Sequence, residues 1–288
     1  MKSLRIAGVP EHFNYPWELA AREGLYQELG LKLAFQEVPG GTGAMCAALA
    51  KQEVDAALLL TEGAVLDVLR GSGNRLLKVY VSTPLEWGIH VPAGSAIEHV
   101  SDLAGRTVAI SREGSGSHLI AIVDALARGF SLEHMRFHTV GSLAGARQAF
   151  ARSEAEVFLW EKTMTQPLVD AGEFRRIGIR AAPWPAFLMS VRPQAYARFR
   201  ELWRPLLDGV VACAWRLQRR RSAAAELAAR YGLQESEVAA WLQAVRWSGS
   251  WRRPAAALNR VVDALQAQGA IAPGAVSLDA IWPGSTRP

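Results

Sequence analysis

A glycine- and serine-rich segment, Gly114–His118, directly follows the apolar run Val108–Ile110 and precedes a further apolar stretch. The two apolar runs predict a buried strand and a helix, and the glycines allow a tight turn between them. Ser115 or Ser117 can cap the helix, whose first backbone N–H groups carry partial positive charge, and Arg112 adds a full charge nearby. This pattern favours a small anionic or strongly polar ligand. The alternative is a capped helix joined to a strand by a flexible loop.

Two acidic residues follow apolar runs at equivalent positions of two similar sequence units. Glu62 comes after Val54–Leu60, and Glu161 comes after Val157–Trp160. As a facing pair, the two carboxyls could bind an amine or share a proton. Each could instead be an exposed acid near a helix N-terminus, where the helix dipole favours negative charge.

Alternating strand and helix patterns predict the framework that positions these residues. Strands are expected at Leu4–Val9, Leu31–Val38, Val54–Leu60 and Leu77–Ser82, and again at Val108–Ile110, His138–Val140, Val157–Trp160 and Phe174–Ile179. Helices between them predict an α/β protein of two lobes, each a parallel-core sheet with flanking helices. Pro- and aromatic-rich connectors, Pro84–Pro92 and Ala182–Val191, join the lobes.

The expected division is residues 1–86 for the first part of lobe 1, 87–188 for lobe 2 and 189–288 for the completion of lobe 1. The last stretch is expected to be helical and to pack on lobe 1, with helices at Pro193–Gln218, Ser222–Arg230, Ser236–Trp247 and Pro254–Gln268. A hinged cleft between the lobes would close around a ligand and exclude water.

Ligands of open parallel sheets lie beyond the carboxyl ends of the strands. The candidate ligand-binding residues at these ends are Glu11, His12, Phe13, Gly41, Thr42, Thr61, Glu62, Ser111, Arg112, Gly114, Ser115, Gly116, Ser117, His118, Trp160 and Glu161. Trp87 and Trp184, in the connectors, could supply flat apolar walls together with Trp160.

Some of these candidates also have purely structural interpretations. Arg112 could pair with Glu113 instead of a ligand, and His118 could be a surface or capping residue. The three tryptophans could be core residues that need no ligand. We expect Thr61 and Ser111 to contact the ligand, because their positions at strand ends leave them few other partners.

Composition excludes several classes of function. The chain has 288 residues, a formal charge of +5, 50% hydrophobic residues and 10 Trp, which excludes a disordered chain. The basic run Arg216–Arg221 has no neighbouring aromatic residues for base stacking, so we expect a solvated helix face and no nucleic-acid partner. Cys46 and Cys213 form no metal or disulfide pattern, and we expect neither a metal nor a cofactor. With no signal peptide or membrane-spanning run, a cytoplasmic protein is expected, periplasmic only if a leader has been removed.

The order of several motifs resembles the type II periplasmic-binding-protein fold, within it the SsuA-like family of solute-binding proteins for nitrate, taurine and aliphatic sulfonates. The motifs are Gly24–Gly30, Gly40–Thr42, Glu53–Ala57, Ser101–Ser111 and Gly114–His118. A second set resembles a signal-less branch of this fold, found in bacteria and fungi and without a settled ligand: Ala7–Phe13, Leu60–Gly63, Trp87–His90, Trp160–Glu161 and Pro183–Pro185.

The resemblance implies a small, anionic organic solute held between the lobes and handed to an ABC permease. It also covers cytosolic enzymes on the same scaffold, in thiamine-pyrimidine and menaquinone synthesis. The cysteine-rich motif of the pyrimidine synthase is missing, so that activity is not transferred. Three hypotheses follow: a non-enzymatic solute-binding protein, a cytosolic enzyme with Glu62, Glu161 or His118 as acid–base groups, and a ligand sensor.

Overall fold

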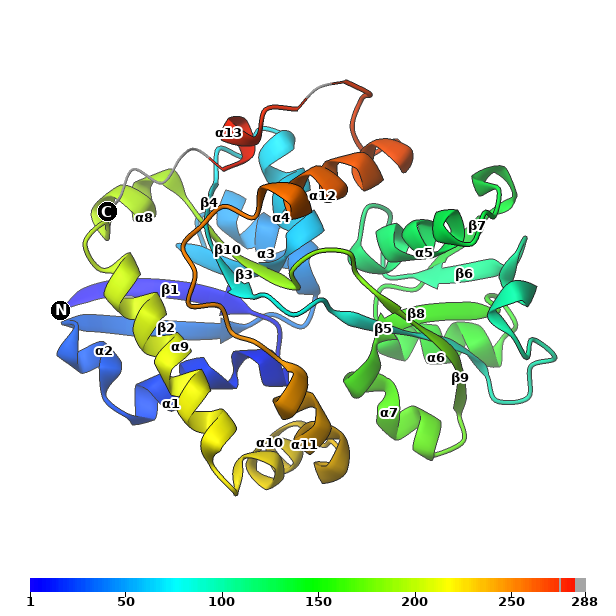
Figure 1. Cartoon of the computed structure of the whole chain (residues 1–288), viewed down its shortest axis with the longest axis horizontal. Coiled ribbons are helices and arrows are strands. Elements are labelled where there is room, and N and C mark those ends of the chain that lie inside the picture. Colours follow the sequence, from blue (N-terminus) through cyan, green and yellow to red (C-terminus); the bar gives the residue numbers. More distant parts are fainter. Residues whose placement is uncertain (275, 283–288) are drawn as a thin grey trace. The chain divides into compact units, whose positions relative to one another are not determined.

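The computed structural model describes residues 1–274 and 276–282 and divides into two compact units (Figure 1). Unit 1 comprises residues 1–83, 184–263 and the described residues from 271 onward, and unit 2 comprises residues 84–183 and 264–270. The boundaries expected from sequence, 86/87 and 188/189, fall inside two strands. Residues 275 and 283–288, which belong to the expected last stretch 189–288, lie outside the described residues.

Unit 1 is built on a five-stranded mixed sheet. Its strands are β1 (Lys2–Gly8), β2 (Leu31–Glu37), β3 (Ala56–Leu60), β4 (Arg75–Val81) and β10 (Phe187–Val191), in the order β2-β1-β3-β10-β4. β1 pairs parallel with β2 and β3, whereas β10 pairs antiparallel with β3 and β4. The expected parallel core is confirmed in β1, β2 and β3, and the chain adds β10 in the opposite direction when it returns from unit 2.

Helices cover this sheet, and most of them come from the C-terminal third of the chain. They are η1 (His12–Asn14), α1 (Tyr15–Arg22), α2 (Leu25–Glu28), α3 (Gly41–Ala50), α4 (Thr61–Leu69), α8 (Pro193–Arg198), α9 (Trp203–Arg219), α10 (Ala223–Tyr231), α11 (Glu235–Ala244), α12 (Ala255–Ala267) and α13 (Leu278–Ile281). α9 packs on α1 and also contacts α2, where a Cβ on Gly209 would lie 2.8 Å from the Leu25 side chain. The small residue therefore sets the distance between α9 and α2.

Two expectations about the C-terminal helices need correction. The single helix expected over Pro193–Gln218 is two helices, because Pro205 has no N–H to continue the bonding and is tolerated only in the first turn of α9. Residues 264–270, at the end of α12 and beyond it, belong to unit 2 and not to the first lobe as expected. In this segment Nε2 of Gln268 lies 3.0 Å from Nδ1 of His118, which is also in unit 2.

Unit 2 repeats the same plan. Its strands are β5 (Glu86–Pro92), β6 (Thr107–Ile110), β7 (Arg136–Thr139), β8 (Val157–Glu161) and β9 (Phe174–Ala181), in the order β7-β6-β8-β5-β9. Its helices are η2 (Val100–Leu103), α5 (Gly116–Ala127), η3 (Leu132–His134), α6 (Leu143–Ala151) and α7 (Lys162–Asp170). β6 is parallel to β7 and β8, and β5 is antiparallel to β8 and β9. Each sheet thus has a parallel part and one antiparallel strand that enters directly after a crossing between units.

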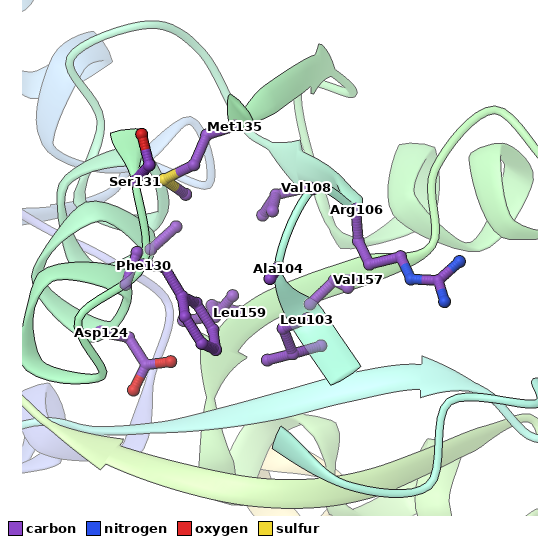
Figure 2. A pocket seen from close by; sticks show the side chains of 13 residues that line it. Leu103, Ala104, Arg106, Val108, Asp124, Phe130, Ser131, Met135, Val157 and Leu159 are labelled. Carbon is purple, nitrogen blue, oxygen red and sulfur yellow. The ribbon is translucent and has the colours of Figure 1, made fainter. Parts of the chain in front are cut away.

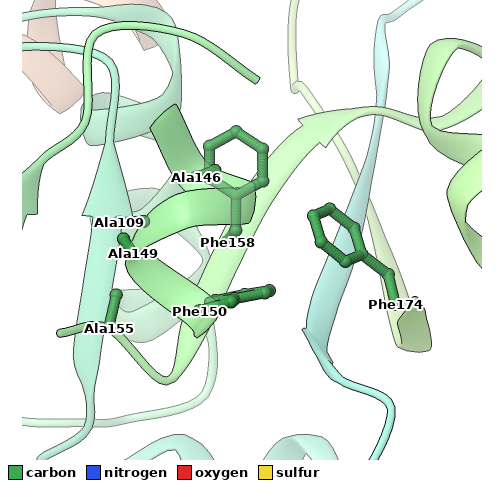
Figure 3. Packing of buried hydrophobic residues seen from close by; sticks show 7 residues of the cluster. All are labelled: Ala109, Ala146, Ala149, Phe150, Ala155, Phe158 and Phe174. Atoms are coloured by element: carbon green, nitrogen blue, oxygen red, sulfur yellow. The ribbon is translucent and has the colours of Figure 1, made fainter. Parts of the chain in front are cut away.

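The core of unit 2 combines small residues with large aromatic rings (Figure 3). Ala146 and Ala149 of α6 are almost fully buried, so their small side chains let this helix lie close to the sheet. Phe150 and Phe174 fill the space beside them, with ring centroids 5.1 Å apart. Packing of this kind holds β8 and α6 rigidly and so fixes the residues that follow β8.

Candidate functional site

The segment Ser111–His118, here called the glycine–serine turn, connects β6 to α5 and is tied together by its own side chains. Ser115 is the N-cap of α5 and accepts a hydrogen bond from the His118 backbone N–H at 3.3 Å. The Ser117 hydroxyl lies 3.0 Å from the Ser115 hydroxyl and accepts from the Ser111 N–H at 3.0 Å. Gly114, with φ of +70°, allows the turn. The turn is therefore preorganised, and of the two serines it is Ser115 that caps the helix.

Removing the cap should destabilise unit 2. We expect Ser115→Ala to lower the free energy of unfolding by about 1 kcal/mol, because the His118 N–H loses its acceptor and Ser117 its neighbour. Urea denaturation followed by circular dichroism measures this loss. Ser95→Ala, which removes a hydroxyl in a loop outside the turn, is the control, and an equal loss there would contradict the assignment.

Arg112 and His118 differ in exposure. Arg112 is exposed and its Nη1 donates to the backbone carbonyl of Glu113 at 3.5 Å. The half-buried His118 accepts from the Gly114 N–H at 3.0 Å through Nδ1, and the same atom lies 3.0 Å from Nε2 of Gln268. Burial lowers the pKa of His118. His118 thus serves the turn as a neutral acceptor, and Gln268 is a neighbour that the sequence did not predict.

Glu161 ends β8 and caps α7. Its carboxyl accepts from the Met164 N–H at 2.7 Å, and burial raises its pKa from 4.5 to about 7. Trp87 of β5 lies directly opposite in the antiparallel pair, so both side chains share one face of the sheet. The Trp87 indole N–H has no hydrogen-bond partner within the described residues. Trp160, half-buried, stacks on Phe158 at 5.1 Å.

Glu62 holds the corresponding place in unit 1. It lies in the first turn of α4, only 4% exposed, and accepts from the Trp184 indole N–H at 2.8 Å. Burial raises its pKa to about 7. Both acids are thus buried, which excludes the alternative of exposed helix-terminal acids. Each unit pairs its acid with a tryptophan that lies next to a crossing between units.

Thr61 and Thr42 have partners inside unit 1. The fully buried Thr61 hydroxyl donates to the Pro185 carbonyl, and its N–H donates to the Ala186 carbonyl at 3.1 Å. Thr42 accepts from the Leu60 N–H at 3.1 Å through its hydroxyl. These bonds fasten the start of α4 to the returning chain and to α3. In unit 2, the Ser111 hydroxyl likewise lies near a protein group, 3.4 Å from the Ser117 hydroxyl.

Gly41 and Glu11 complete the edge residues of unit 1. Gly41 has φ of +66° and begins α3 just before Thr42. Glu11 is half-buried, and it precedes η1 in extended conformation. Both therefore lie at turns that follow strands of the sheet, as expected from the order of the sequence.

His12 and Phe13, which follow β1, are buried among aromatic rings. The His12 ring lies 4.5 Å from Phe13, 4.2 Å from Trp241 and 6.3 Å from Tyr231, between ring centroids. We call Phe13, Tyr231 and Trp241 the His12 aromatic cluster. Tyr231 and Trp241 come from α10 and α11, which pack on each other (Figure 1), and sequence reasoning did not include them. Their positions depend on how the C-terminal helices pack on the start of the chain, and the local sequence around them does not predict this packing.

The predicted site residues form two groups, one in each unit. Unit 1 holds Glu11, His12, Phe13, Gly41, Thr42, Thr61, Glu62 and Trp184, and unit 2 holds Trp87, Ser111, Arg112, Gly114, Ser115, Gly116, Ser117, His118, Trp160 and Glu161. Within each unit they come after the carboxyl ends of the parallel strands or from the crossing segments.

A separate small pocket of about 30 Å³ lies in unit 2 (Figure 2). Its lining includes Leu103, Val108, Phe130 and Val157, near the amino ends of β6 and β8, with the Asp124 carboxylate at one side. It contains none of the predicted site residues. Across residues 1–274 and 276–282 no group of three or more His, Cys, Asp or Glu side chains could hold a metal ion, and no helix has the length and apolar character to cross a membrane.

Two five-stranded mixed sheets with flanking helices, joined by crossing segments, match the architecture of the type II periplasmic-binding-protein fold, and the chain has this fold. Residues 87–179 match the family described as Ca3427-like PBP.

Among solved structures, the chain is similar to the CA3427 gene product of Candida albicans, described as defining a new family with the generic periplasmic-binding-protein fold. The TM-score is 0.85 with 22% identity, over 98% of this chain and 94% of that one. It is also similar to the alkanesulfonate-binding protein SsuA of Xanthomonas axonopodis pv. citri bound to MOPS, with a TM-score of 0.83, 19% identity and 98% of both chains covered. The aliphatic sulphonate-binding SsuA of Escherichia coli gives 0.74 and 18%, over 95% and 94%. No curated protein sequence matches the chain.

Proposed function

We propose that this protein binds a small organic solute with an acidic group. The observation that carries the proposal is the preorganised glycine–serine turn, where the capped N-terminus of the 12-residue helix α5 stands beside exposed Arg112. The fold supports a binding role, and the similar SsuA proteins are described as binding sulfonates. A sulfonate, nitrate or carboxylate would place its oxygens at the turn.

Calorimetric titration with MOPS, ethanesulfonate, nitrate and acetate tests the proposal. At least one probe is expected to bind, and Arg112→Ala should weaken that binding about tenfold or more, since a hydrogen bond to a charged group contributes about 1.5–3 kcal/mol. Arg152→Ala removes the same charge from an exposed site at the end of α6 and should leave the affinity unchanged. Absence of binding across the panel would overturn the proposal.

We further propose that the protein delivers the bound solute to an ABC permease. The support for this delivery is the similarity to solved structures described as the ligand-binding component of an ABC-type import system and as part of a putative sulfonate ABC transporter. Uptake of the bound probe by cells that express the chain with a candidate permease tests it, and the Arg112→Ala chain should support less uptake.

Enzymatic use of the same scaffold is the second candidate, and the two buried carboxyls favour it. Glu62 and Glu161 both have a pKa raised to about 7, which suits general acid–base groups at neutral pH. If Glu62→Gln only changes the affinity for the solute and no turnover of a bound probe is detected, the binding role stands alone.

A further inference from the structure

The hydrogen bonds of His118 determine which of its two ring nitrogens carries the proton. Nδ1 lies 3.0 Å from the backbone nitrogen of Gly114 and 3.0 Å from Nε2 of Gln268. A backbone N–H only donates, so Nδ1 is the unprotonated, accepting nitrogen. Burial lowers the pKa of His118 from 6.5, and the ring is therefore neutral at pH 7. Its single N–H group is then on Nε2.

Gln268, in the segment 264–270 of unit 2, supports this tautomer. Because Nδ1 is an acceptor, the side-chain amide faces it with the NH₂ group. The amide oxygen Oε1 is buried and has no hydrogen-bond partner among residues 1–274 and 276–282. An unpaired buried acceptor costs about 1–3 kcal/mol, but turning the amide over would bring two acceptors, Oε1 and Nδ1, against each other. The amide is therefore held in the orientation that keeps Nδ1 unprotonated.

The Nε2–H group of His118 is open to a ligand. Nε2 has no partner in the part of the chain that the structure describes, and it is not one of the buried unpaired atoms, so solvent reaches it. Phe137 of β7 contacts the ring edge-to-face, with 4.3 Å between the centroids, and limits its rotation. His118 is also in the first turn of α5, beside the N–H groups of Gly116 and Ser117, which have no partner inside the helix. An oriented donor thus lies next to the helix N-terminus without any part of the chain having to move.

We propose that His118 donates a hydrogen bond from Nε2–H to the acidic group of the solute, and that Gln268 is a positioning residue that holds His118 in this tautomer. The inference rests on the proposed function and deepens it, because it concerns the same glycine–serine turn and stays within unit 2. The ligand chemistry is that of an oxyanion, a sulfonate, nitrate or carboxylate. Its oxygens would accept from neutral N–H groups as well as from the charged Arg112.

Calorimetric titration of the full chain with ethanesulfonate at pH 7.5 tests both roles. His118→Phe keeps a ring against Phe137 but has no N–H, so it should weaken binding about tenfold or more, since a hydrogen bond to a charged group contributes about 1.5–3 kcal/mol. Gln268→Glu replaces the donor that faces Nδ1 by a carboxylate, which draws the ring proton to Nδ1 and should weaken binding by about the same factor. Ala267→Glu adds the same charge at the exposed neighbouring position and should have a clearly smaller effect.

The ¹⁵N resonances of the His118 ring test the tautomer without a ligand. We expect an unprotonated Nδ1 and a protonated Nε2 in the wild-type chain, and a protonated Nδ1 in Gln268→Glu. Ethanesulfonate should then shift the Nε2 resonance more than the Nδ1 resonance in the wild-type chain.

The outcomes separate this inference from the proposed function. If Nδ1 carries the proton in the wild-type chain, or if Gln268→Glu binds no more weakly than Ala267→Glu, the role of Gln268 is overturned. If ethanesulfonate binds without shifting Nε2, or if His118→Phe binds it equally well, the role of His118 is overturned while the solute-binding function stands. If none of the anionic probes binds the wild-type chain, the proposed function fails and the inference with it.

Discussion

Replacing His12 with phenylalanine is expected to make the chain markedly more resistant to acid. Burial lowers the pKa of His12 from 6.5 to about 3, so the unfolded chain takes up a proton at mildly acidic pH that the folded chain refuses. The stability tied to neutral His12 is complete above pH 6.5 and is lost as the pH falls toward 3. Between pH 7.5 and pH 4 the loss is about 3 kcal/mol. Phenylalanine does not titrate, so the part of the stability loss that is due to His12 should be absent in His12→Phe.

Urea denaturation at pH 7.5 and pH 4 measures the effect. At pH 7.5 His12→Phe should be at least as stable as the wild-type chain, because two unpaired buried nitrogens are removed. At pH 4 it should be more stable by about 3 kcal/mol. His134→Gln, at an exposed position in unit 2, is the control and should follow the wild-type chain. Equal acid sensitivity of wild type and His12→Phe would show that the ring is protonated in the folded state.

Part of the acid sensitivity will remain in the variant. His90 of unit 2 is fully buried and has a pKa lowered to about 4, chiefly by burial and further by Arg176. Its nitrogens have protein neighbours, the Phe158 carbonyl at 3.3 Å from Nδ1 and Arg176 Nε at 3.3 Å from Nε2. His90 thus provides the contrast of a buried histidine whose two ring nitrogens both lie next to polar protein atoms.

The alternation of strands and helices made the fold predictable, because local patterns report burial and local conformation. Val54–Leu60 and Val157–Trp160 are apolar runs followed by polar residues, and both are central strands, β3 and β8. The direction of a strand, in contrast, cannot be predicted from such local patterns. Phe187–Val191 is apolar throughout and would suit either direction, so its antiparallel insertion between β3 and β4 depends on where the chain returns.

The candidate site was predictable only as far as strand ends define it. Glu62 and Glu161 follow from their places after β3 and β8, but their burial does not, because the tryptophans beside them lie elsewhere in the sequence. The same holds for His12, whose cover is supplied by Trp241 of α11. Contacts between helices that are far apart in the sequence determine which polar groups are removed from water. The hydrophobic periodicity of a segment carries no information about these contacts.

Replacing Glu62 with glutamine is expected to stabilise the chain at alkaline pH and to change little at acidic pH. Burial raises the pKa of Glu62 from 4.5 to about 7, so its protonated form stabilises the fold below pH 4.5 and this contribution is lost as the pH rises through 7. The loss at pH 8.5 is about 3 kcal/mol. Glutamine stays neutral, and its side-chain oxygen can still accept from the Trp184 indole, so the variant should avoid most of the loss.

Urea denaturation at pH 5 and pH 8.5 measures the gain, with Glu133→Gln at an exposed position as the control. Glu161→Gln should gain less than Glu62→Gln, although burial raises the pKa of Glu161 to about 7 as well. Glu161 caps α7 through the Met164 N–H, and glutamine is a weaker acceptor at this helix terminus. Equal destabilisation of Glu62→Gln at both pH values would mean that the carboxylate form is the one the fold requires. A gain confined to pH 8.5 would mean that the folded chain keeps a protonated carboxyl beside Trp184 at pH 6.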